Sequence, residues 1–196
     1  MFNIQYCFPT ALFSTTNLEL VDVMLPITKK VLLDENLVNK RWNYRTTYSP
    51  YEGLEKLEEF KPFCNYVADL GMQFMIKQGY RLEFNRFNPR LFASEMVRGD
   101  FHNTHAHPNS VLSGIFYLQV PKNSSAIVFT DPRAIRKVVK RQTEFETASN
   151  IDELVINPHT GMLLMWESWF EHYVPENYML GKKDKRITLV FNLNAN

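Results

Sequence analysis

The spacing of apolar positions changes near residue 80 of this 196-residue chain. Before that point apolar residues recur every three or four positions, which is the period of an amphipathic helix. This pattern predicts one helix within residues 54–79, where Pro62 can occupy the first turn. A shorter helix is predicted from about Asn17, a suitable N-terminal cap, to Pro26, which is expected to interrupt it. We therefore expect residues 1–80 to form a helical layer.

From residue 81 onward the predicted elements are short strands. They are rich in β-branched and aromatic residues and are bounded by turn-forming residues. The candidates are RLEFNRF, LFASEMV, SVLSGIFYLQV, SAIVFT, GMLLMWE, EHYVP and RITLVFNLN. Such a set favours a β-sandwich or barrel with helices on one outer face. No linker separates two folding units, so residues 1–196 are expected to form a single domain.

Composition narrows the class of protein. Apolar residues make up 45% of the chain and the formal net charge is +1, so neither disorder nor a polyanionic partner such as nucleic acid is indicated. No apolar run approaches the roughly 20 residues that cross a bilayer, and no signal peptide is evident. Cys7 and Cys64 are isolated and are expected to be reduced core residues. We predict a cytoplasmic protein without a membrane partner, and we interpret the basic segment 133–142 as a solvated helix face.

Histidines are concentrated in the segment FHNTHAHPNS. If this segment is extended, His105 and His107 point to the same face and can converge on one metal ion. Two imidazoles hold Fe(II), Zn or Cu poorly, so a third ligand is needed. Of His102, His159 and His172, the last is favoured because it lies in a predicted strand. A histidine pair alone is a weak signal, and a surface cluster is the alternative interpretation.

Arg186 strengthens the metal interpretation. It begins the last predicted strand, after a polar segment that is typical of a hairpin loop following His172. Thr188 shares its face, because residues two apart in a strand point the same way. A guanidinium can bind a carboxylate through two hydrogen bonds, so a metal beside this Arg-x-Thr suits a dicarboxylic keto acid. The alternative is that Arg186 is a solvated residue ending the basic run KKDKR.

The ordered motifs are H-x-H-P, LSGIFYLQVP, FTDPR, MLLMWESWFEHYVP and RITLVFN. From about residue 99 to 192 this order resembles a family of 2-oxoglutarate- and Fe(II)-dependent oxygenases, related to the prolyl-hydroxylase-like enzymes and found in bacteria and phages. The resemblance implies a mainly β fold with N-terminal helices. Residues 81–196 would form a double-stranded β-helix, jelly-roll or cupin-like, and residues 1–80 a helical support on one outer face.

The resemblance also implies the metal ligands. His105 and His172 correspond to the two histidines of the family's triad. His107 stands where most members of the wider superfamily have Asp or Glu, so the expected triad is His105, His107 and His172. Replacement of one histidine by a carboxylate such as Asp131 is left open.

The co-substrate site is implied in the same way. Arg186 and Thr188 correspond to the Arg-x-Ser/Thr that receives the distal carboxylate of 2-oxoglutarate. Tyr117 and Ser113, four residues apart on one strand, are implied as further lining of this pocket. Trp166 and Trp169 are expected to pack rather than react.

The expected activity follows from the resemblance. Fe(II), 2-oxoglutarate and molecular oxygen are the expected cofactor and co-substrates, and oxidative decarboxylation to succinate would be coupled to C–H oxidation, as in a hydroxylase. The primary substrate, a small molecule or a protein side chain, and the oligomeric state are left open. Two alternatives are a three-histidine cupin-type dioxygenase that uses no keto acid and a non-catalytic metal-binding β-sandwich.

Overall fold

The computed structural model describes residue 3 and residues 7–41, 43–49, 53–133, 142–147, 149–178 and 180–195. Two α-helices, α1 (Leu18–Leu32) and α2 (Lys61–Lys77), and two 3-10 turns, η1 (Leu54–Lys56) and η2 (Glu58–Phe60), accompany the strands. The strands are β1 (Leu12–Thr16), β2 (Asn39–Arg41), β3 (Tyr44–Thr46), β4 (Asn88–Met96), β5 (His102–His105), β6 (Leu112–Gln119), β7 (Ile127–Thr130), β8 (Glu153–Ile156), β9 (Met162–Glu167), β10 (His172–Val174) and β11 (Arg186–Asn194).

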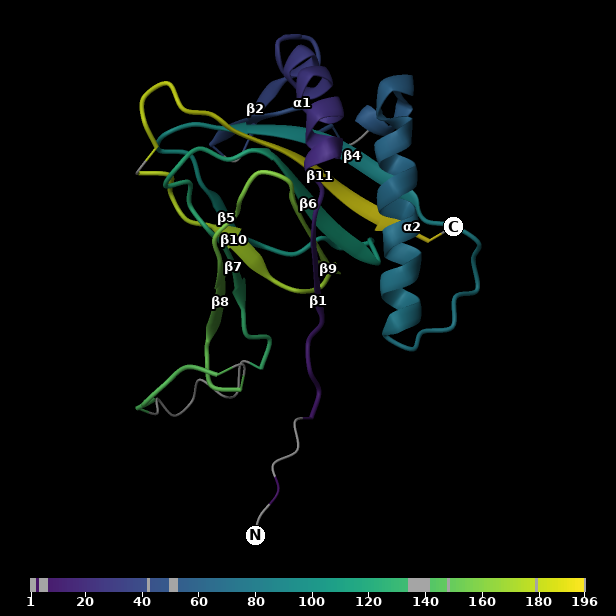
Figure 1. Ribbon diagram of the computed structural model, residues 1–196, viewed down its shortest axis with the longest axis vertical. Helices are drawn as coiled ribbons and strands as arrows, with labels where there is room; N and C mark the ends of the chain where they lie inside the picture. The colour runs from purple at the N-terminus through teal and green to yellow at the C-terminus, as the bar shows by residue number, and fades with distance from the viewer. Residues whose placement is uncertain are drawn as a thin grey trace.

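The strands form two antiparallel sheets that face each other (Figure 1). The large sheet has the order β1-β9-β6-β11-β4-β3-β2, and the small sheet has the order β5-β10-β7-β8. From β4 to β11 the chain passes repeatedly between them: β4, β6, β9 and β11 lie in the large sheet, whereas β5, the consecutive strands β7 and β8, and β10 lie in the small one. This is the wiring of a double-stranded β-helix, a jelly-roll architecture, and it confirms the expected fold.

The helices cover only the outer face of the large sheet, on the side away from the small sheet (Figure 1). Phe63 of α2 packs against Phe116 of β6 and Phe191 of β11, with ring centroids 5.6 and 6.0 Å away. Pro62 lies in the first turn of α2, as expected. The helical layer therefore supports the large sheet without approaching the space between the sheets.

Helix α1 begins as predicted but ends later. The side chain of Asn17 accepts a hydrogen bond from the backbone N–H of Leu20, which confirms the cap. The expected interruption at Pro26 is wrong, since α1 continues to Leu32. An internal proline costs about 3 kcal/mol. Met24 and Leu32, on either side of Pro26, are fully buried, and burial of each such side chain contributes about 1.5–3 kcal/mol.

Residues 1–80 are not purely helical, which corrects the boundary predicted at residue 80. Strand β1 pairs with β9, and the β2–β3 hairpin extends the large sheet beside β4. The predicted strand in 81–87 does not form, and the first strand after α2 starts at Asn88. Short polar strands such as β2 carry too little apolar alternation to be predicted, because pairing with a neighbouring strand is what orders them.

The two faces of β11 have different surroundings. Ile187, Leu189 and Phe191 pack into the core under the helices, whereas Val190 packs between the sheets. Because side chains alternate along a strand, Arg186, Thr188 and Asn192 share the inner face with Val190. The structure thus resolves an ambiguity of the sequence: the polar face of this strand points inward.

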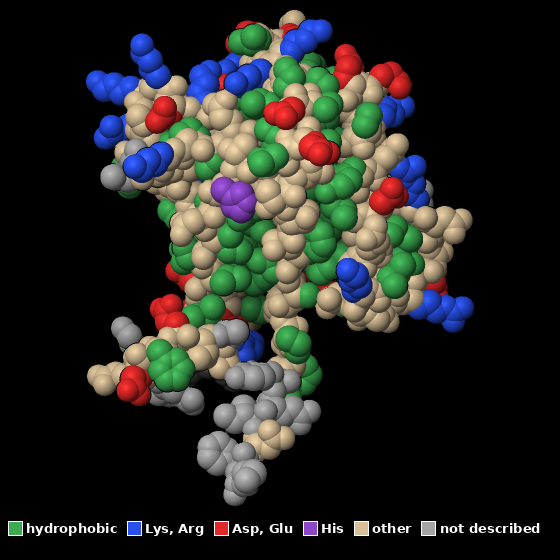
Figure 2. Space-filling model, viewed as in Figure 1, with side chains coloured by type: hydrophobic (Ala, Val, Ile, Leu, Met, Phe, Trp, Pro, Cys, Tyr) green, Lys and Arg blue, Asp and Glu red, His purple; other side chains and the backbone are tan. Residues whose placement is uncertain are grey.

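The basic run before β11 is divided between the surface and the interior. Lys182, Lys183 and Lys185 are exposed, and Figure 2 shows basic side chains gathered at the upper left, over this loop. Arg186, the next residue, is 1% exposed. Arg186 is therefore not a solvated end of the basic run.

Two further expectations bear on the class of protein. Neither cysteine forms a disulfide, as expected, but only Cys64 is buried and Cys7 is exposed. No helix in the described ranges is long and apolar enough to span a membrane. Within the basic segment 133–142, residues 134–141 lie outside the described residues.

Candidate metal centre

Three histidines from two neighbouring segments converge between the sheets. His172 begins β10 and His105 ends β5, and the two residues are paired in the antiparallel register. His107 lies two residues beyond the end of β5, where its backbone N–H donates to the carbonyl of Ser168 at 2.9 Å. The condition that the strand extends through both histidines is not met, because β5 ends at His105, yet the ring of His107 still lies near the other two.

The ligand atoms of these histidines are close enough to share one ion. One nitrogen each from His105, His107 and His172 lie within 4.8 Å of one another. The Nε2 atoms of His107 and His172 are 3.3 Å apart. Two nitrogens bound to one metal at about 2.1 Å and at a right angle would be separated by about 3 Å. The spacing fits neighbouring ligands of a transition metal.

Backbone carbonyls fix the orientation of two of the rings. The Nδ1 of His105 bonds to the carbonyl of Asn103 at 2.8 Å, and the Nδ1 of His172 bonds to the carbonyl of Phe170 at 3.0 Å. A carbonyl can only accept, so each Nδ1 carries a proton and each Nε2 keeps the lone pair that can bind a metal. This is the arrangement by which proteins orient metal-binding histidines.

The surroundings keep these imidazoles neutral. Burial lowers the pKa of His107 and of His172 to about 3, and the nearby ring of His105 acts in the same direction. Burial also lowers the pKa of His105. Since the neutral imidazole is the form that binds metal, the three rings are ready to bind at neutral pH.

His102 belongs to the surroundings of the cluster. Its ring stacks on that of His105, with centroids 3.9 Å apart, and its Nδ1 hydrogen-bonds with the hydroxyl of Tyr44 at 3.3 Å. The two other candidates lie elsewhere. His159 is exposed and hydrogen-bonds with Thr16, and the carboxylate of Asp131 pairs with Arg133 at 2.9 Å. Neither belongs to the group of potential ligands among the described residues.

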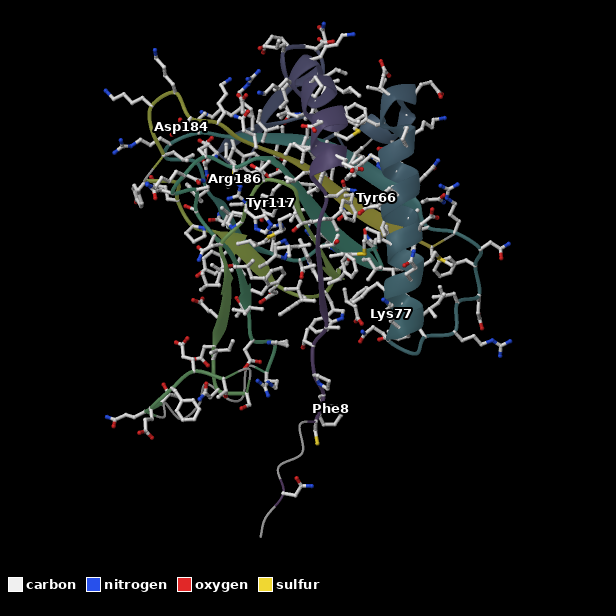
Figure 3. All side chains as sticks on the ribbon, viewed as in Figure 1. Phe8, Tyr66, Lys77, Tyr117, Asp184 and Arg186 are labelled. Carbon is white, nitrogen blue, oxygen red and sulfur yellow. The ribbon has the colours of Figure 1, made fainter. Side chains whose placement is uncertain are left out.

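A buried arginine lies on the large sheet opposite the histidines. Nη1 of Arg186 donates to the carbonyl of Ser125 at 2.9 Å, and Nη2 donates to the hydroxyl of Tyr117 at 3.4 Å. The guanidinium also lies over the ring of Tyr117, 5.0 Å from its centroid. Figure 3 shows these two residues side by side between the sheets, whereas Tyr66 and Lys77 mark α2 on the other side of the large sheet.

The positive charge of Arg186 is not compensated within the described protein. Arg186 forms no ion pair with any described residue, and its Nε is buried without a partner there. A buried, unpaired charge is strongly unfavourable, and proteins satisfy such groups with a partner or a ligand. A carboxylate that enters beside Nε would provide both the missing acceptor and the missing charge.

Thr188 and Ser113, two further candidates for the co-substrate site, lie in different places. Thr188 is buried next to Arg186 on the inner face of β11 and is paired with Tyr117 in the register. Ser113 lies on the same face of β6 but at the other end, opposite Asn192. Its hydroxyl bonds with that of Ser168 at 2.7 Å and donates to Asn192 at 2.9 Å. Ser113 is thus beside the histidine loop rather than at Arg186.

Trp166 is a residue of this site for which the sequence suggested only packing. Its ring meets that of His172 edge-on at 4.7 Å, and its Nε1 is buried without a partner among the described residues. An isolated tryptophan in an apolar strand carries no sequence signal for a position beside a metal ligand.

A family model described as "Putative 2OG-Fe(II) oxygenase" matches residues 90–192, which is more than half of the chain. The chain belongs to this 2OG-Fe(II) oxygenase family. The matched range begins in β4 and ends in β11, so it contains all three clustered histidines and Arg186. The resemblance inferred from the order of motifs is confirmed.

Solved structures share the fold at low sequence identity. A prolyl-4-hydroxylase from Pseudomonas putida superposes with a TM-score of 0.61 at 14% identity, covering 95% of this chain and 94% of that one. The epimerase SnoN, in complex with Fe3+, alpha ketoglutarate and nogalamycin RO, gives 0.66 at 8% identity, with 95% and 79% covered. HygX from Streptomyces hygroscopicus, with nickel, 2-oxoglutarate and hygromycin B bound, gives 0.60 at 9% identity, with 95% and 84% covered. No curated protein sequence matches this chain.

The residues of this 2OG-Fe(II) oxygenase fit the groups that its family implies. Neutral imidazoles are suitable ligands for Fe(II), and the three rings offer nitrogens that lie within 4.8 Å of one another. The buried Nε of Arg186 lacks the acceptor that a carboxylate oxygen of 2-oxoglutarate would supply. Three neutral ligands add no charge, so the site with Fe(II) and the 2-oxoglutarate dianion would be about neutral.

Proposed function

We propose that this chain catalyses oxidation of a substrate C–H bond, as a hydroxylase, with Fe(II) held by His105, His107 and His172. Arg186, with Thr188 and Tyr117, would receive the distal carboxylate of 2-oxoglutarate. The observation that supports this assignment most is the buried guanidinium without a carboxylate partner, on the strand face that points toward three converged imidazoles. When bound, iron and the keto acid supply the oxidising chemistry, in which oxidative decarboxylation to succinate and carbon dioxide is coupled to substrate oxidation.

The protein's own contribution is orientation. The carbonyls of Asn103 and Phe170 hold the rings of His105 and His172 so that their Nε2 atoms point into the site. The carbonyl of Ser125 and the hydroxyl of Tyr117 accept hydrogen bonds from Nη1 and Nη2 of Arg186. The Nε of Arg186 therefore stays available to the ligand. These contacts lie within the protein itself, so they can orient both groups for binding.

The second contribution is exclusion of water. Tyr117, Phe129 and Trp166 are each at most 1% exposed and pack between the sheets beside His172 and Arg186. In such surroundings a charged hydrogen bond from Arg186 to a carboxylate is stronger than it would be in water. The same apolar wall would keep solvent away from reactive species.

Succinate formation tests the proposal. Purified protein with Fe(II), ascorbate and 2-oxoglutarate is expected to release succinate slowly without a primary substrate, and titration calorimetry with Zn(II) loaded is expected to show binding of one keto acid. Loss of both in Arg186→Met, with metal binding retained, would support the assigned roles. If neither succinate nor keto-acid binding is seen in the wild-type protein, the proposal is wrong.

The arginine also separates the alternatives. A three-histidine dioxygenase that uses no keto acid would keep metal-dependent oxygen consumption in Arg186→Met. A non-catalytic metal-binding β-sandwich would bind metal without consuming oxygen. The cytoplasmic location expected from the sequence stays a prediction.

A further inference from the structure

A cavity of about 340 Å³ lies at the end of β11 that carries Asn192 and Asn194, away from Arg186 at the start of the strand. Its polar lining includes Tyr48, Arg90, Asn109, Asn192 and Asn194. We call it the Asn192 cavity. Its volume lies at the lower end of the range of about 300–1,000 Å³ that is usual for small-molecule sites.

A short chain of hydrogen bonds joins the cavity to the metal-ligand loop. The hydroxyl of Ser113 donates to Oδ1 of Asn192 and also forms a hydrogen bond with the hydroxyl of Ser168. The backbone carbonyl of Ser168 in turn accepts a hydrogen bond from the backbone N–H of His107. Pro108, the residue after His107, is part of the cavity wall. The cavity wall therefore continues directly from the loop that carries His107.

Asn192 is held in one orientation by this chain. Since its Oδ1 accepts from Ser113, its Nδ2 points away from Ser113, and Nδ2 has no hydrogen-bond partner among the described residues. The side chain is only partly buried and lines the cavity. It thus presents a fixed donor to whatever molecule enters.

Arg90 is held in a comparable way, and its charge is compensated. Its Nε pairs with the carboxylate of Glu55 at 3.3 Å, and its Nη2 donates to the carbonyl of Ser49 at 3.0 Å. Glu55 is fixed in turn, because it accepts from the backbone N–H of Leu91 at 2.9 Å. Arg90 is the only charged side chain among the described lining residues. The wall therefore offers donors without a net positive charge.

We infer that the Asn192 cavity binds the primary substrate through its hydroxyl or carbonyl oxygens, and that the bound group is neutral and polar, of about the size of one sugar ring. A phosphate or carboxylate would find its charge already cancelled by Glu55. A flat apolar group would leave Nδ2 of Asn192 without an acceptor, which is unfavourable. This inference rests on the proposed function, because it assigns the substrate of the same site.

Nuclear magnetic resonance of the full chain loaded with Zn(II) and 2-oxoglutarate tests the inference. The side-chain amide signals of Asn192 are assigned by their loss in Asn192→Asp, which keeps the acceptor for Ser113 and removes the donor. Methyl glucoside and N-acetylglucosamine are the neutral probes, and glucose 6-phosphate and benzyl alcohol are the charged and apolar comparators. The neutral probes are expected to shift these signals saturably at millimolar concentration, and the comparators are not.

Variants make the test specific. Asn192→Asp is expected to weaken binding of the neutral probes at least about tenfold, the effect of losing one buried hydrogen bond. Asn85→Asp, in an exposed loop, is the matched control and is expected to bind them as the wild type does. The inference is overturned if no neutral probe shifts the Asn192 signals, or if Asn192→Asp binds the probes unchanged. Binding of 2-oxoglutarate in the same samples reports separately on the proposed function, so the two can fail independently.

Discussion

The Nε2 atoms of His107 and His172 lie 3.3 Å apart, although 65 positions separate the two residues in the chain. The β-helix wiring places the loop after β5 beside the start of β10, and the carbonyl of Ser168 holds the backbone of His107 there. Such a separation is that of neighbouring ligands on one ion rather than of two solvated rings. Each ligand position can be tested separately.

Replacing His172 by alanine is expected to lower Fe(II) affinity by more than about 100-fold. Changes to groups that only orient a ligand cost about 10- to 100-fold, and loss of a ligand should cost more. Anaerobic competition against a chromogenic chelator measures the affinity. His159→Ala, on the exposed histidine, is the control and should bind as the wild type does. Equal affinity of His172→Ala and the control would exclude His172 as a ligand.

Substitutions at position 107 test whether His107 binds the metal or only lies near it. His107→Asp would create the two-histidine, one-carboxylate set that is typical of the wider superfamily, and we expect it to retain Fe(II) binding. His107→Ala is expected to weaken it more than about 100-fold, as His172→Ala does, because one donor is lost. The same competition assay compares the two variants. If alanine and aspartate bind metal equally well, residue 107 does not contribute a ligand.

Arg186→Met is expected to have opposite effects on stability and on ligand binding. The dissociation constant for 2-oxoglutarate should rise at least about 30-fold, since removing one partner of a buried charged hydrogen bond costs about 2 kcal/mol or more. Without ligand, urea unfolding should show no loss of stability, because the substitution removes a buried charge that has no carboxylate partner in the described residues. Arg133→Met, at a more exposed arginine, is the control. A large loss of stability in the absence of ligand would show that Arg186 is structural.

Lowering the pH should weaken the ion pairs that Glu95 forms with Arg45 and Lys185 on the outer face of the large sheet. Burial alone would raise the pKa of Glu95, but hydrogen bonds and charge from Lys185 and Arg45, at 2.9 and 2.7 Å, lower it overall. A lowered pKa means that the folded state binds this proton less readily, so the stabilisation is present above about pH 4.5 and is lost as the pH falls. Glu95→Gln should therefore cost about 1–3 kcal/mol at pH 7.

The pH dependence of the free energy of unfolding provides a control for the prediction about Glu95. In urea unfolding the difference between the wild type and Glu95→Gln should shrink as the pH falls below about 4.5, because the lowered pKa places the loss of stabilisation below the ordinary value. Glu83→Gln, in an exposed loop, should leave the curve unchanged. A difference that stays constant with pH would mean that Glu95 acts through packing rather than charge.

Gly114 in β6 is expected to tolerate no side chain. A Cβ there would lie 2.2 Å from Cζ of Phe191 and 2.6 Å from the carbonyl oxygen of Leu164. The oxygen belongs to the paired strand β9 and cannot move without disturbing the sheet. Gly114→Ala should therefore destabilise the protein by about 1–3 kcal/mol, as overpacking does elsewhere. Thermal unfolding measures the loss, and Gly79→Ala is unsuitable as a control because its φ is +85°.

The sequence by itself determined the strands whose apolar content is strong. Continuous or alternating apolar runs mark the strands β4, β6, β9 and β11. Such runs predict a strand whatever it packs against, because their apolar side chains must be buried. The order of H-x-H, His172 and Arg186 was also sufficient to indicate the family, since motif order is a property of the chain. The continuation of α1 past Pro26 was not readable, because the burial that stabilises it comes from the sheet beneath.

Only the tertiary structure decided which face of β11 points inward, and this choice gives Arg186 its role. The alternation of side chains along the strand assigned Arg186 and Asn192 to one face but did not show whether that face was exposed to solvent. The helices cover the apolar face, so the polar face must meet the small sheet. The same packing separated Ser113 from the Arg186 site and brought it to Asn192. Local pattern specifies which side chains share a face, whereas contacts between strands distant in sequence determine what that face meets.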